Sequence, residues 1–205
     1  MIDLRLYLVT GPSPDLAATE AVVRAAVAGG VTALQLRDPG APTRRLVDAA
    51  RRLAGAGVPL VVNDRLDVAI AAGAAGVHLG QSDLHPLDAR AIAGPGLTIG
   101  WSVTTPEQVD ELAGWPAGTV DYLGVGPIHP TGSKDDAARP IGYAGIEEVR
   151  RHTPLPVVAI GGIGADHVGS CLAAGAQGVA VISAIWAAPD PTAAAEALRR
   201  ALDAR

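Results

Sequence analysis

Two aspartates, Asp64 and Asp83, follow apolar stretches of the chain and are candidate ligands for a metal ion. Asp64 comes directly after LVVN, and Asp83 lies just past GVHLG in the string HLGQSD. If the two stretches are neighbouring parallel strands, both carboxylates lie at one rim of the sheet, and their repulsion favours a cation between them. Oxygen ligands without a histidine or thiolate cluster favour Mg²⁺. The alternative is that each Asp caps the following helix.

Gln35 and Arg37 place an amide and a guanidinium on one face of a predicted strand. Because they are two residues apart, their side chains point the same way, while Leu34 and Leu36 point the other way. Buried polar groups need partners. Two interpretations remain open, namely an internal Arg–Asp pair, or two groups that reach a polar ligand at the end of the strand.

Lys134 is the one lysine among 16 Lys and Arg residues, and Asn63 is the one asparagine. Asn63 ends a predicted strand, whereas Lys134 lies in residues 126–140, the longest segment without helix or strand periodicity. A loop of this length in a compact domain is usually functional or mobile. Lys134 is therefore either an ordinary surface residue or an anion-binding group.

The last two predicted strands end in residues that suit phosphate binding. Gly161 and Gly162 follow VVAI, and Ile182 and Ser183 follow GVAV. Glycine lets backbone N–H groups approach an anion, and barrels often bind phosphate with the loops after strands seven and eight. The alternative is that the glycines serve close packing only.

An alternating series of strands and helices must position these residues. Short β-branched stretches alternate with stretches of helical period eight times, which favours a closed parallel barrel over an open sheet. We predict one α/β domain over residues 1–205, a single (β/α)8 TIM barrel with its active site at the carboxyl ends of the strands. The predicted strands are 5–10, 33–37, 60–63, 76–79, 98–102, 121–125, 156–160 and 178–182, and helices follow from about residues 15, 43, 65, 86, 105, 144, 165 and 190.

Composition argues against several classes of protein. The formal net charge is −5 and the basic residues are scattered, so we expect neither nucleic acid nor an anionic membrane as a partner. The one cysteine, Cys171, excludes an intramolecular disulfide. We find no secretion signal and no stretch of about 18 apolar residues. These features predict a cytoplasmic protein that binds small molecules.

The histidines and serines show no catalytic or metal-binding spacing. No serine stands in the context of a nucleophile elbow, so a Ser-His-Asp triad is not expected. We expect all five histidines to be structural or solvent-facing: His78, His85, His129, His152 and His167.

Taken together, several segments resemble the thiamine-phosphate synthase family over nearly the whole chain. They are LYLVT, GGVTALQLRD, VPLVVNDRLDVAIAAGAAGVHLGQSDL, GWSV, DYLGVGPIHPTGSKDDA, VVAIGGI and GVAVISAI. The resemblance implies a (β/α)8 barrel, Mg²⁺ and two substrates. These are 4-amino-5-hydroxymethyl-2-methylpyrimidine diphosphate and 4-methyl-5-(2-phosphoethyl)thiazole, here the pyrimidine diphosphate and the thiazole phosphate. The products would be thiamine phosphate and diphosphate.

The resemblance also implies roles for individual residues. Asp64 and Asp83 would hold Mg²⁺, and Lys134, Arg37 and Ser102 would be the catalytic residues. Ligands of the pyrimidine diphosphate would be Gln35, Arg37, Asn63, Ser102 and Lys134, and ligands of the thiazole phosphate would be Thr131, Gly132, Ser133, Gly161, Gly162, Ile182 and Ser183.

The chain departs from the family pattern at three positions. Pro39 stands where the family has a lysine expected to contact the diphosphate, Gly11 replaces an acidic residue, and His129 replaces an aromatic one. Two other functions remain alternatives. A thiazole tautomerase would need a histidine where this chain has Pro127, and a non-catalytic phosphate-binding barrel is favoured only by Pro39. The sequence leaves the oligomeric state open, a homo-oligomer included.

Overall fold

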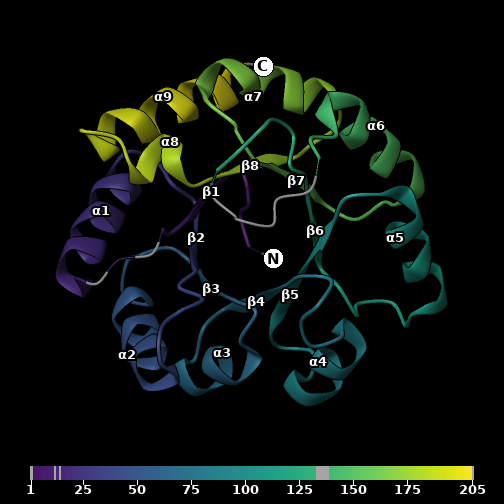
Figure 1. Cartoon of the computed structure of the whole chain (residues 1–205), viewed down its shortest axis with the longest axis horizontal. Coiled ribbons are helices and arrows are strands. Elements are labelled where there is room, and N and C mark those ends of the chain that lie inside the picture. The colour runs from purple at the N-terminus through teal and green to yellow at the C-terminus, as the bar shows by residue number, and fades with distance from the viewer. Residues whose placement is uncertain (1, 12, 14, 133–138, 205) are drawn as a thin grey trace.

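The eight strands form a closed parallel barrel, which confirms the fold expected from the sequence. The computed structural model describes residues 2–11, 13, 15–132 and 139–204. The strands follow chain order around the barrel, and the last pairs with the first to close it (Figure 1). Every predicted strand end lies within one residue of the observed end. The strands are β1 (Leu6–Val9), β2 (Ala33–Leu36), β3 (Leu60–Asn63), β4 (Gly76–Leu79), β5 (Thr98–Val103), β6 (Tyr122–Val125), β7 (Val157–Ile160) and β8 (Gly178–Val181).

Helices surround the barrel, as Figure 1 shows. They are α1 (Leu16–Ala28), α2 (Thr43–Leu53), α3 (Leu66–Ala72), α4 (Pro86–Ala93), α5 (Pro106–Asp110), α6 (Gly142–His152), α7 (Ala165–Ala173), α8 (Ser183–Trp186) and α9 (Pro191–Asp203), with a 3₁₀-helix, η1 (Glu111–Gly114). The sequence did not predict α8 and η1, because four residues are too few to show a helical period. Among the described residues, no helix combines the length and apolarity needed to cross a membrane.

Side chains alternate along each strand between the helices and the barrel interior. On β1, Leu6 and Leu8 belong to the larger apolar cluster that the helices cover. Tyr7 and Val9 belong to a smaller cluster with inward residues of other strands, such as Val61. This alternation is the period of two expected for a barrel strand. It therefore decides which polar side chains enter the interior.

At the inward-facing positions of Gly100 and Gly124, large polar side chains fill the space that a glycine leaves. A Cβ atom at Gly100 would lie 2.2 Å from Cζ of Tyr122 and 2.5 Å from Nδ1 of His78. A Cβ atom at Gly124 would lie 2.9 Å from Cε1 of His78. Interiors are close-packed, so the glycines on β5 and β6 are what admit Tyr122 and His78.

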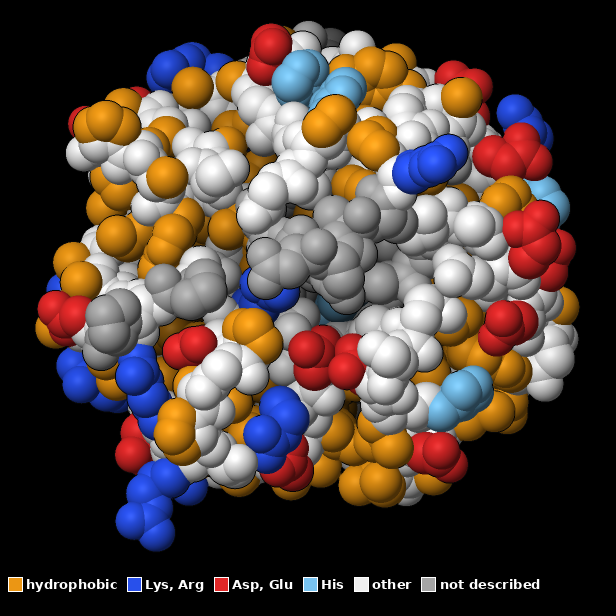
Figure 2. Space-filling model, viewed as in Figure 1, with side chains coloured by type: hydrophobic (Ala, Val, Ile, Leu, Met, Phe, Trp, Pro, Cys, Tyr) orange, Lys and Arg blue, Asp and Glu red, His pale blue; other side chains and the backbone are white. Residues whose placement is uncertain are grey.

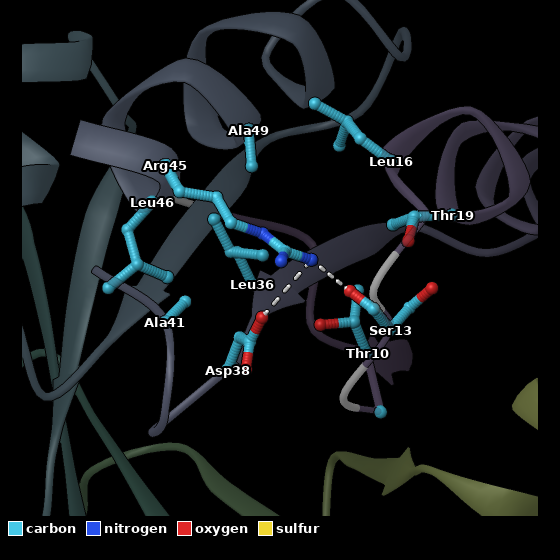
Figure 3. A pocket seen from close by; sticks show the side chains of 11 residues that line it. Thr10, Ser13, Leu16, Thr19, Leu36, Asp38, Ala41, Arg45, Leu46 and Ala49 are labelled. Carbon is cyan, nitrogen blue, oxygen red and sulfur yellow. Dashed lines mark hydrogen bonds and ion pairs between the residues drawn. The ribbon is translucent and has the colours of Figure 1, made fainter. Parts of the chain in front are cut away.

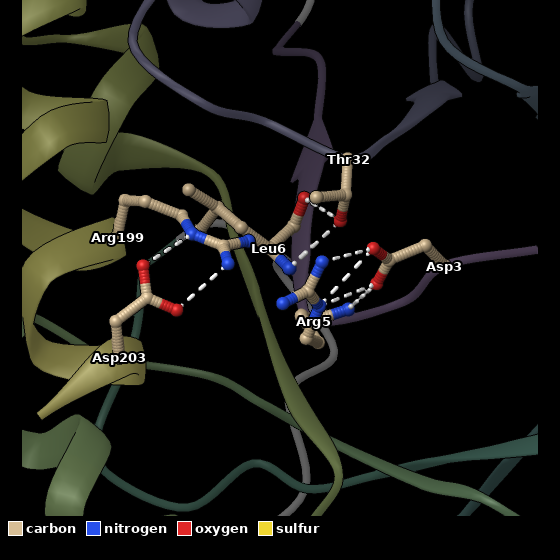
Figure 4. Close-up of polar contacts among 6 residues, drawn as sticks. All are labelled: Asp3, Arg5, Leu6, Thr32, Arg199 and Asp203. Carbon is tan, nitrogen blue, oxygen red and sulfur yellow. Dashed lines mark hydrogen bonds and ion pairs between the residues drawn. The ribbon is translucent and has the colours of Figure 1, made fainter. Parts of the chain in front are cut away.

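Ion pairs lie at the end of the barrel where the strands begin (Figure 4). Arg5 contacts Asp3 at 2.7 Å, and Arg199 of α9 contacts Asp203 at 2.7 Å. These arginines lower the pKa of both carboxyl groups below the ordinary range. Nearby, Thr32 accepts a hydrogen bond from the Leu6 amide at 3.0 Å and donates one to the Leu6 carbonyl at 3.1 Å.

Candidate functional site

The predicted site residues that the structure describes lie at the carboxyl ends of the strands and in the loops that follow them. Figure 2 shows one end of the barrel, where acidic and basic side chains both lie close to the centre. Two predicted site residues, Ser133 and Lys134, lie outside the described residues.

Arg37 follows β2, and its backbone is held by hydrogen bonds to Thr10. Its amide donates to Oγ1 of Thr10 at 2.9 Å, and the Thr10 hydroxyl donates to the Arg37 carbonyl at 3.3 Å. Within the described residues, the buried Nε of Arg37 has no hydrogen-bond partner. The neighbouring Asp38 pairs instead with Arg45. Among the described residues, no aspartate pairs with Arg37, and its buried Nε is a donor suited to an anion.

Asp64 stands at the end of β3 in an unusual backbone conformation. Its φ is +62°, which makes it the one non-glycine residue with positive φ in the described part of the chain. The Asp64 amide donates to the His78 carbonyl of β4 at 2.8 Å, so the chain turns at the rim between β3 and β4. Asp and Asn tolerate this region better than most residues, but strain of this kind clusters at functional sites.

Asp83 lies in the β4–α4 connection, and its carboxylate is fixed by the turn. Oδ2 accepts a hydrogen bond from the Gly80 amide at 2.7 Å. Neither aspartate caps a helix, because the N-cap residues of α3 and α4 are Arg65 and His85. The helix-cap alternative is therefore wrong for both. Asp64 and Asp83 follow two adjacent strands, as a shared metal ion would require.

Gln35 and Ser102 are joined by a chain of polar side chains through the barrel interior. The Gln35 amide donates to the Tyr7 hydroxyl at 2.9 Å, and the Tyr7 and Tyr122 hydroxyl groups lie 3.1 Å apart. Nδ1 of His78 lies 2.9 Å from the Tyr122 hydroxyl, and Nε2 of His78 lies 2.9 Å from Oγ of Ser102. Two predicted ligands from β2 and β5 are thereby connected.

Burial controls the protonation of the two tyrosines in this row of hydrogen-bonded side chains. It raises the pKa of Tyr7 and of Tyr122 well above the ordinary value, so both phenols are protonated at neutral pH. His78 is buried, and its contact with Ser102 was not predicted from the sequence. The alternation that places Ser102 inward also places Tyr7, His78 and Tyr122 inward, and that pattern was available in the sequence.

The glycines after β7 pack tightly against the loop after β6. Gly161 and Gly162 have φ of +101° and +67°. A Cβ atom at Gly161 would lie 2.6 Å from Cβ of Pro127, and one at Gly162 would lie 2.7 Å from Cβ of His129. Close packing therefore requires glycine at both positions whether or not phosphate binds there. Ile128 and His129 donate backbone hydrogen bonds to Ile160 and Gly161 at 3.0 Å each, which fixes the start of the loop.

The other predicted ligands of the thiazole phosphate lie around this loop and at the end of β8. Thr131 and Gly132 are the last described residues before residue 133, and a Cβ atom at Gly132 would have no neighbour within 4 Å. Ile182 is the N-cap residue of α8, and Ser183 is its first residue. The short helix α8 therefore begins at the predicted phosphate ligands.

Figure 3 shows the Arg45 side chain reaching toward Asp38 and Ser13. From α2, its guanidinium lies 3.9 Å from the Asp38 carboxylate and donates to the Ser13 carbonyl. This pocket also contains apolar side chains such as Leu36 and Leu46. Arg45 thus links the loops after β1 and β2, and its guanidinium contacts residues of these loops.

The arrangement suits the binding of anions and one hard cation. Among the described residues, no group of three His, Cys, Asp or Glu side chains forms a metal cage. Mg²⁺ needs no such cage, because it commonly takes one or two carboxylates together with substrate phosphates and water. Asp64, Asp83, Asn63 and Arg37 are the groups available for a magnesium–phosphate complex.

Comparison with known proteins gives one consistent family. A family profile described as thiamine monophosphate synthase matches residues 6–185. A thiamine-phosphate synthase of Xanthobacter autotrophicus is 52% identical over 209 residues, covering 98% of this chain and 96% of that protein. One of Azorhizobium caulinodans is 50% identical over 208 residues, with coverage of 98% and 96%.

Solved structures agree with the sequence comparisons. A thiamine phosphate pyrophosphorylase from Pyrococcus furiosus superposes with a TM-score of 0.85 at 37% identity, covering 98% of this chain and 96% of that one. Such similarity extends over the barrel and the loops that carry the candidate site. The chain therefore belongs to the thiamine-phosphate synthase family and is an enzyme of the transferase class.

Proposed function

We propose that the chain condenses the pyrimidine diphosphate with the thiazole phosphate to give thiamine phosphate and diphosphate. The observation that carries the proposal is the buried, unpartnered Nε of Arg37 at the barrel mouth. An arginine that has no acidic partner among the described residues and is anchored through its backbone by Thr10 is prepared for an anionic ligand. Gln35 and Asn63 lie at the ends of the same and the next strand, and they would bind the same substrate.

The proposed metal ion is Mg²⁺, held by Asp64 and Asp83. The residues fit it, since the carboxylate of Asp83 is oriented by the Gly80 amide and Asp64 is fixed at the turn after β3. Hard oxygen ligands on adjacent strands, without thiolates, favour Mg²⁺ over softer metals. When bound, the ion would neutralise charge on the departing diphosphate.

The reaction implied by the family is a dissociative substitution. The bond between the pyrimidine methylene carbon and the diphosphate oxygen breaks, and the electron pair leaves with the diphosphate. The aminopyrimidine ring stabilises the cation, and the thiazole nitrogen then supplies the electron pair of the new C–N bond. Arg37 and Lys134 would stabilise the leaving group, while Ser102 would hold the ring. No nucleophilic side chain and no strong base are required.

The thiazole phosphate would bind on the other side of the mouth. Its proposed ligands are Thr131, Gly132, Ser133, Gly161, Gly162, Ile182 and Ser183. In the described residues, the Gly162 amide has no backbone acceptor, which supports a role in binding an anion. The tightly packed loop after β6 would set the distance between the two substrates.

The tautomerase alternative finds no support in the site. His129, two residues beyond the required position, lies 3.1 Å through Nε2 from the Tyr143 hydroxyl and packs against the His167 ring at 4.3 Å between centroids. Its ring is therefore engaged by neighbouring side chains. A non-catalytic barrel rests on Pro39 alone.

Mixing both substrates with the protein and Mg²⁺ tests the proposal. Release of diphosphate that depends on the thiazole phosphate is expected. Isomerisation of the thiazole phosphate without diphosphate release would identify a tautomerase. Binding of either substrate with no conversion would identify a non-catalytic barrel.

A cytoplasmic location of the protein and its assembly into a homo-oligomer stay predictions.

A further inference from the structure

Five side chains from five strands form the hydrogen-bonded chain between Gln35 and Ser102. The order is Gln35, Tyr7, Tyr122, His78 and Ser102, and each link measures 2.9 to 3.1 Å. Tyr7 and Tyr122 are each 1% exposed, Gln35 is 4% exposed and His78 is 9% exposed. Water is therefore largely excluded from the first four members.

The barrel interior is shaped around this chain. Side chains larger than hydrogen at Gly100 or Gly124 would collide with the rings of Tyr122 and His78. The Tyr7 and Tyr122 rings meet edge to face at 6.1 Å between centroids, and His78 lies 5.4 Å from Tyr122. Packing thus fixes the rings of Tyr7, Tyr122 and His78, on which the order of the hydrogen-bonded chain depends.

The chemistry of Gln35 sets the direction in which the hydrogen bonds run along these five side chains. Its amide nitrogen can only donate, so the Tyr7 oxygen accepts. Tyr7 then has one proton to donate, and among the described residues Tyr122 is the only other hydrogen-bond partner of its hydroxyl group. The Tyr122 hydroxyl therefore accepts from Tyr7 and directs its own proton to Nδ1 of His78.

The opposite direction would leave a donor without an acceptor. If Tyr122 donated to Tyr7, the Tyr7 oxygen would accept twice, and its own proton would have no acceptor among the described residues. A buried donor without an acceptor costs free energy. With Nδ1 accepting, neutral His78 carries its proton on Nε2, and that nitrogen donates to Oγ of Ser102.

We propose that this chain makes Ser102 a hydrogen-bond donor toward the pyrimidine diphosphate, with Tyr7, Tyr122 and His78 as positioning residues. Because Ser102 already accepts from His78, its hydroxyl proton is available for an acceptor atom of the substrate. All five groups are uncharged, which suits a ring nitrogen of the aminopyrimidine better than a phosphate oxygen. The role of Ser102 rests on the proposed function, whereas the direction of the chain does not.

The tautomer of His78 can be measured without any substrate. In protein labelled with ¹⁵N-histidine, NMR should show His78 neutral, with the proton on Nε2. His78→Gln assigns the resonance, since the spectrum of the variant lacks it. In Tyr122→Phe the preference for this tautomer should weaken. A proton on Nδ1 of His78 in the wild type would overturn the proposed direction.

Kinetics test what the direction does for the reaction. Tyr122→Phe keeps the ring but removes the hydroxyl group, and kcat/KM for the pyrimidine diphosphate should fall about tenfold, as for loss of one oriented hydrogen bond. KM for the thiazole phosphate should stay unchanged. Tyr143→Phe is the matched control, because that hydroxyl bonds to His129 outside the chain. Equal losses in both variants would overturn the assignment.

A double-mutant cycle separates positioning from general destabilisation. In a Ser102→Ala background, Tyr122→Phe should cost less than about twofold, because the group that the chain orients is already absent. A full additional tenfold loss would show that Tyr122 does not act through Ser102. His78→Gln, which retains an N–H near the Nε2 position, should keep more activity than His78→Leu. Equal activities would also overturn the proposal.

These outcomes are distinguishable from failure of the proposed function. If the wild-type protein released no diphosphate, the proposed condensation would be refuted. The NMR result would still decide the direction of the chain. If the protein converted its substrates and the double-mutant cycle showed no coupling between Tyr122 and Ser102, only the positioning role would be refuted. Thermal unfolding of each variant confirms that the barrel is folded before its rate is compared.

Discussion

At the end of the barrel where the strands begin, Arg5 and Arg199 each form an ion pair with a nearby aspartate, whereas at the other end Arg37 keeps a buried nitrogen without a partner among the described residues. The side chains are chemically alike, and the difference lies in whether the protein itself satisfies them. A buried donor left unsatisfied is costly unless a ligand supplies the acceptor. Arg5 and Arg199 thus use their guanidinium groups within the fold, whereas Arg37 keeps a donor at the end of the barrel where the predicted ligands lie.

Backbone conformation gives the same contrast. Among the described residues, every residue with positive φ is a glycine except Asp64, which lies at the carboxyl end of β3. Such a conformation costs about 1 kcal/mol or more for a residue with a side chain. The strained Asp64 and the unpartnered Nε of Arg37 therefore lie at the same end of the barrel, as expected where binding rather than folding selected these two residues.

Removal of the metal should have the largest effect. Excess chelator is expected to abolish diphosphate release, and added Mg²⁺ should restore it. Asp64→Ala or Asp83→Ala should raise the Mg²⁺ requirement and lower kcat by on the order of 10²-fold or more, because charge on the leaving group is less well neutralised. Full activity in excess chelator would refute the metal assignment.

Two variants control for folding in this experiment. Asp64→Gly suits the positive φ and should leave the melting temperature equal or higher while activity is lost. Asp88→Ala removes an exposed carboxylate from α4 and should leave the Mg²⁺ requirement unchanged. A similar loss in Asp88→Ala would point to a general charge effect.

Lys134 should have the next largest effect. Lys134→Ala is expected to lower kcat/KM by on the order of 10²-fold, as removal of one charge-assisted donor to a leaving group often does. Lys134→Arg should recover part of the loss, since a planar guanidinium does not replace a compact ammonium group. A decrease below about threefold would show that the lysine is incidental to catalysis.

The barrel could be predicted almost residue by residue, because its strands are short, strongly apolar and regularly spaced. Local periodicity is sufficient there, whereas the site depends on contacts between strands that are distant in sequence. Asp64 and Asp83 were candidates on spacing alone, but only the cap residues Arg65 and His85 exclude the helix-cap alternative. The roles of the site residues stay predictions.

What the sequence did not reveal is the chain behind Ser102. His78 has no metal-ligand spacing, and its partners Tyr122 and Ser102 come from other strands. Only the register of the closed barrel brings these strands together. The glycines at positions 100 and 124 were visible, yet their meaning depends on which ring fills the space beside them.

A smaller gain is expected from placing at position 39 the lysine that the sequence resemblance implies. Pro39→Lys should raise kcat/KM for the pyrimidine diphosphate by up to about tenfold, the effect of a contact worth roughly 1 to 1.5 kcal/mol. Thiazole phosphate binding should hardly change. Arg45 is engaged by Asp38 and Ser13, so it is not expected to replace the lysine. An unchanged rate in Pro39→Lys with a large loss in Arg44→Ala or Arg45→Ala would show the opposite.

The smallest effect is expected at the end where the strands begin. The Arg5 guanidinium lowers the pKa of Asp3 below its ordinary value of 3.8, so the pair stabilises the fold above that pH and the contribution disappears as the pH falls through the lowered pKa. Asp3→Asn should therefore lower the melting temperature slightly at pH 7, and by less as the pH falls below 3.8. The change should be small because exposed ion pairs contribute little. Turnover should equal that of the wild type, and a tenfold loss of kcat in Asp3→Asn would show that the two ends are not independent.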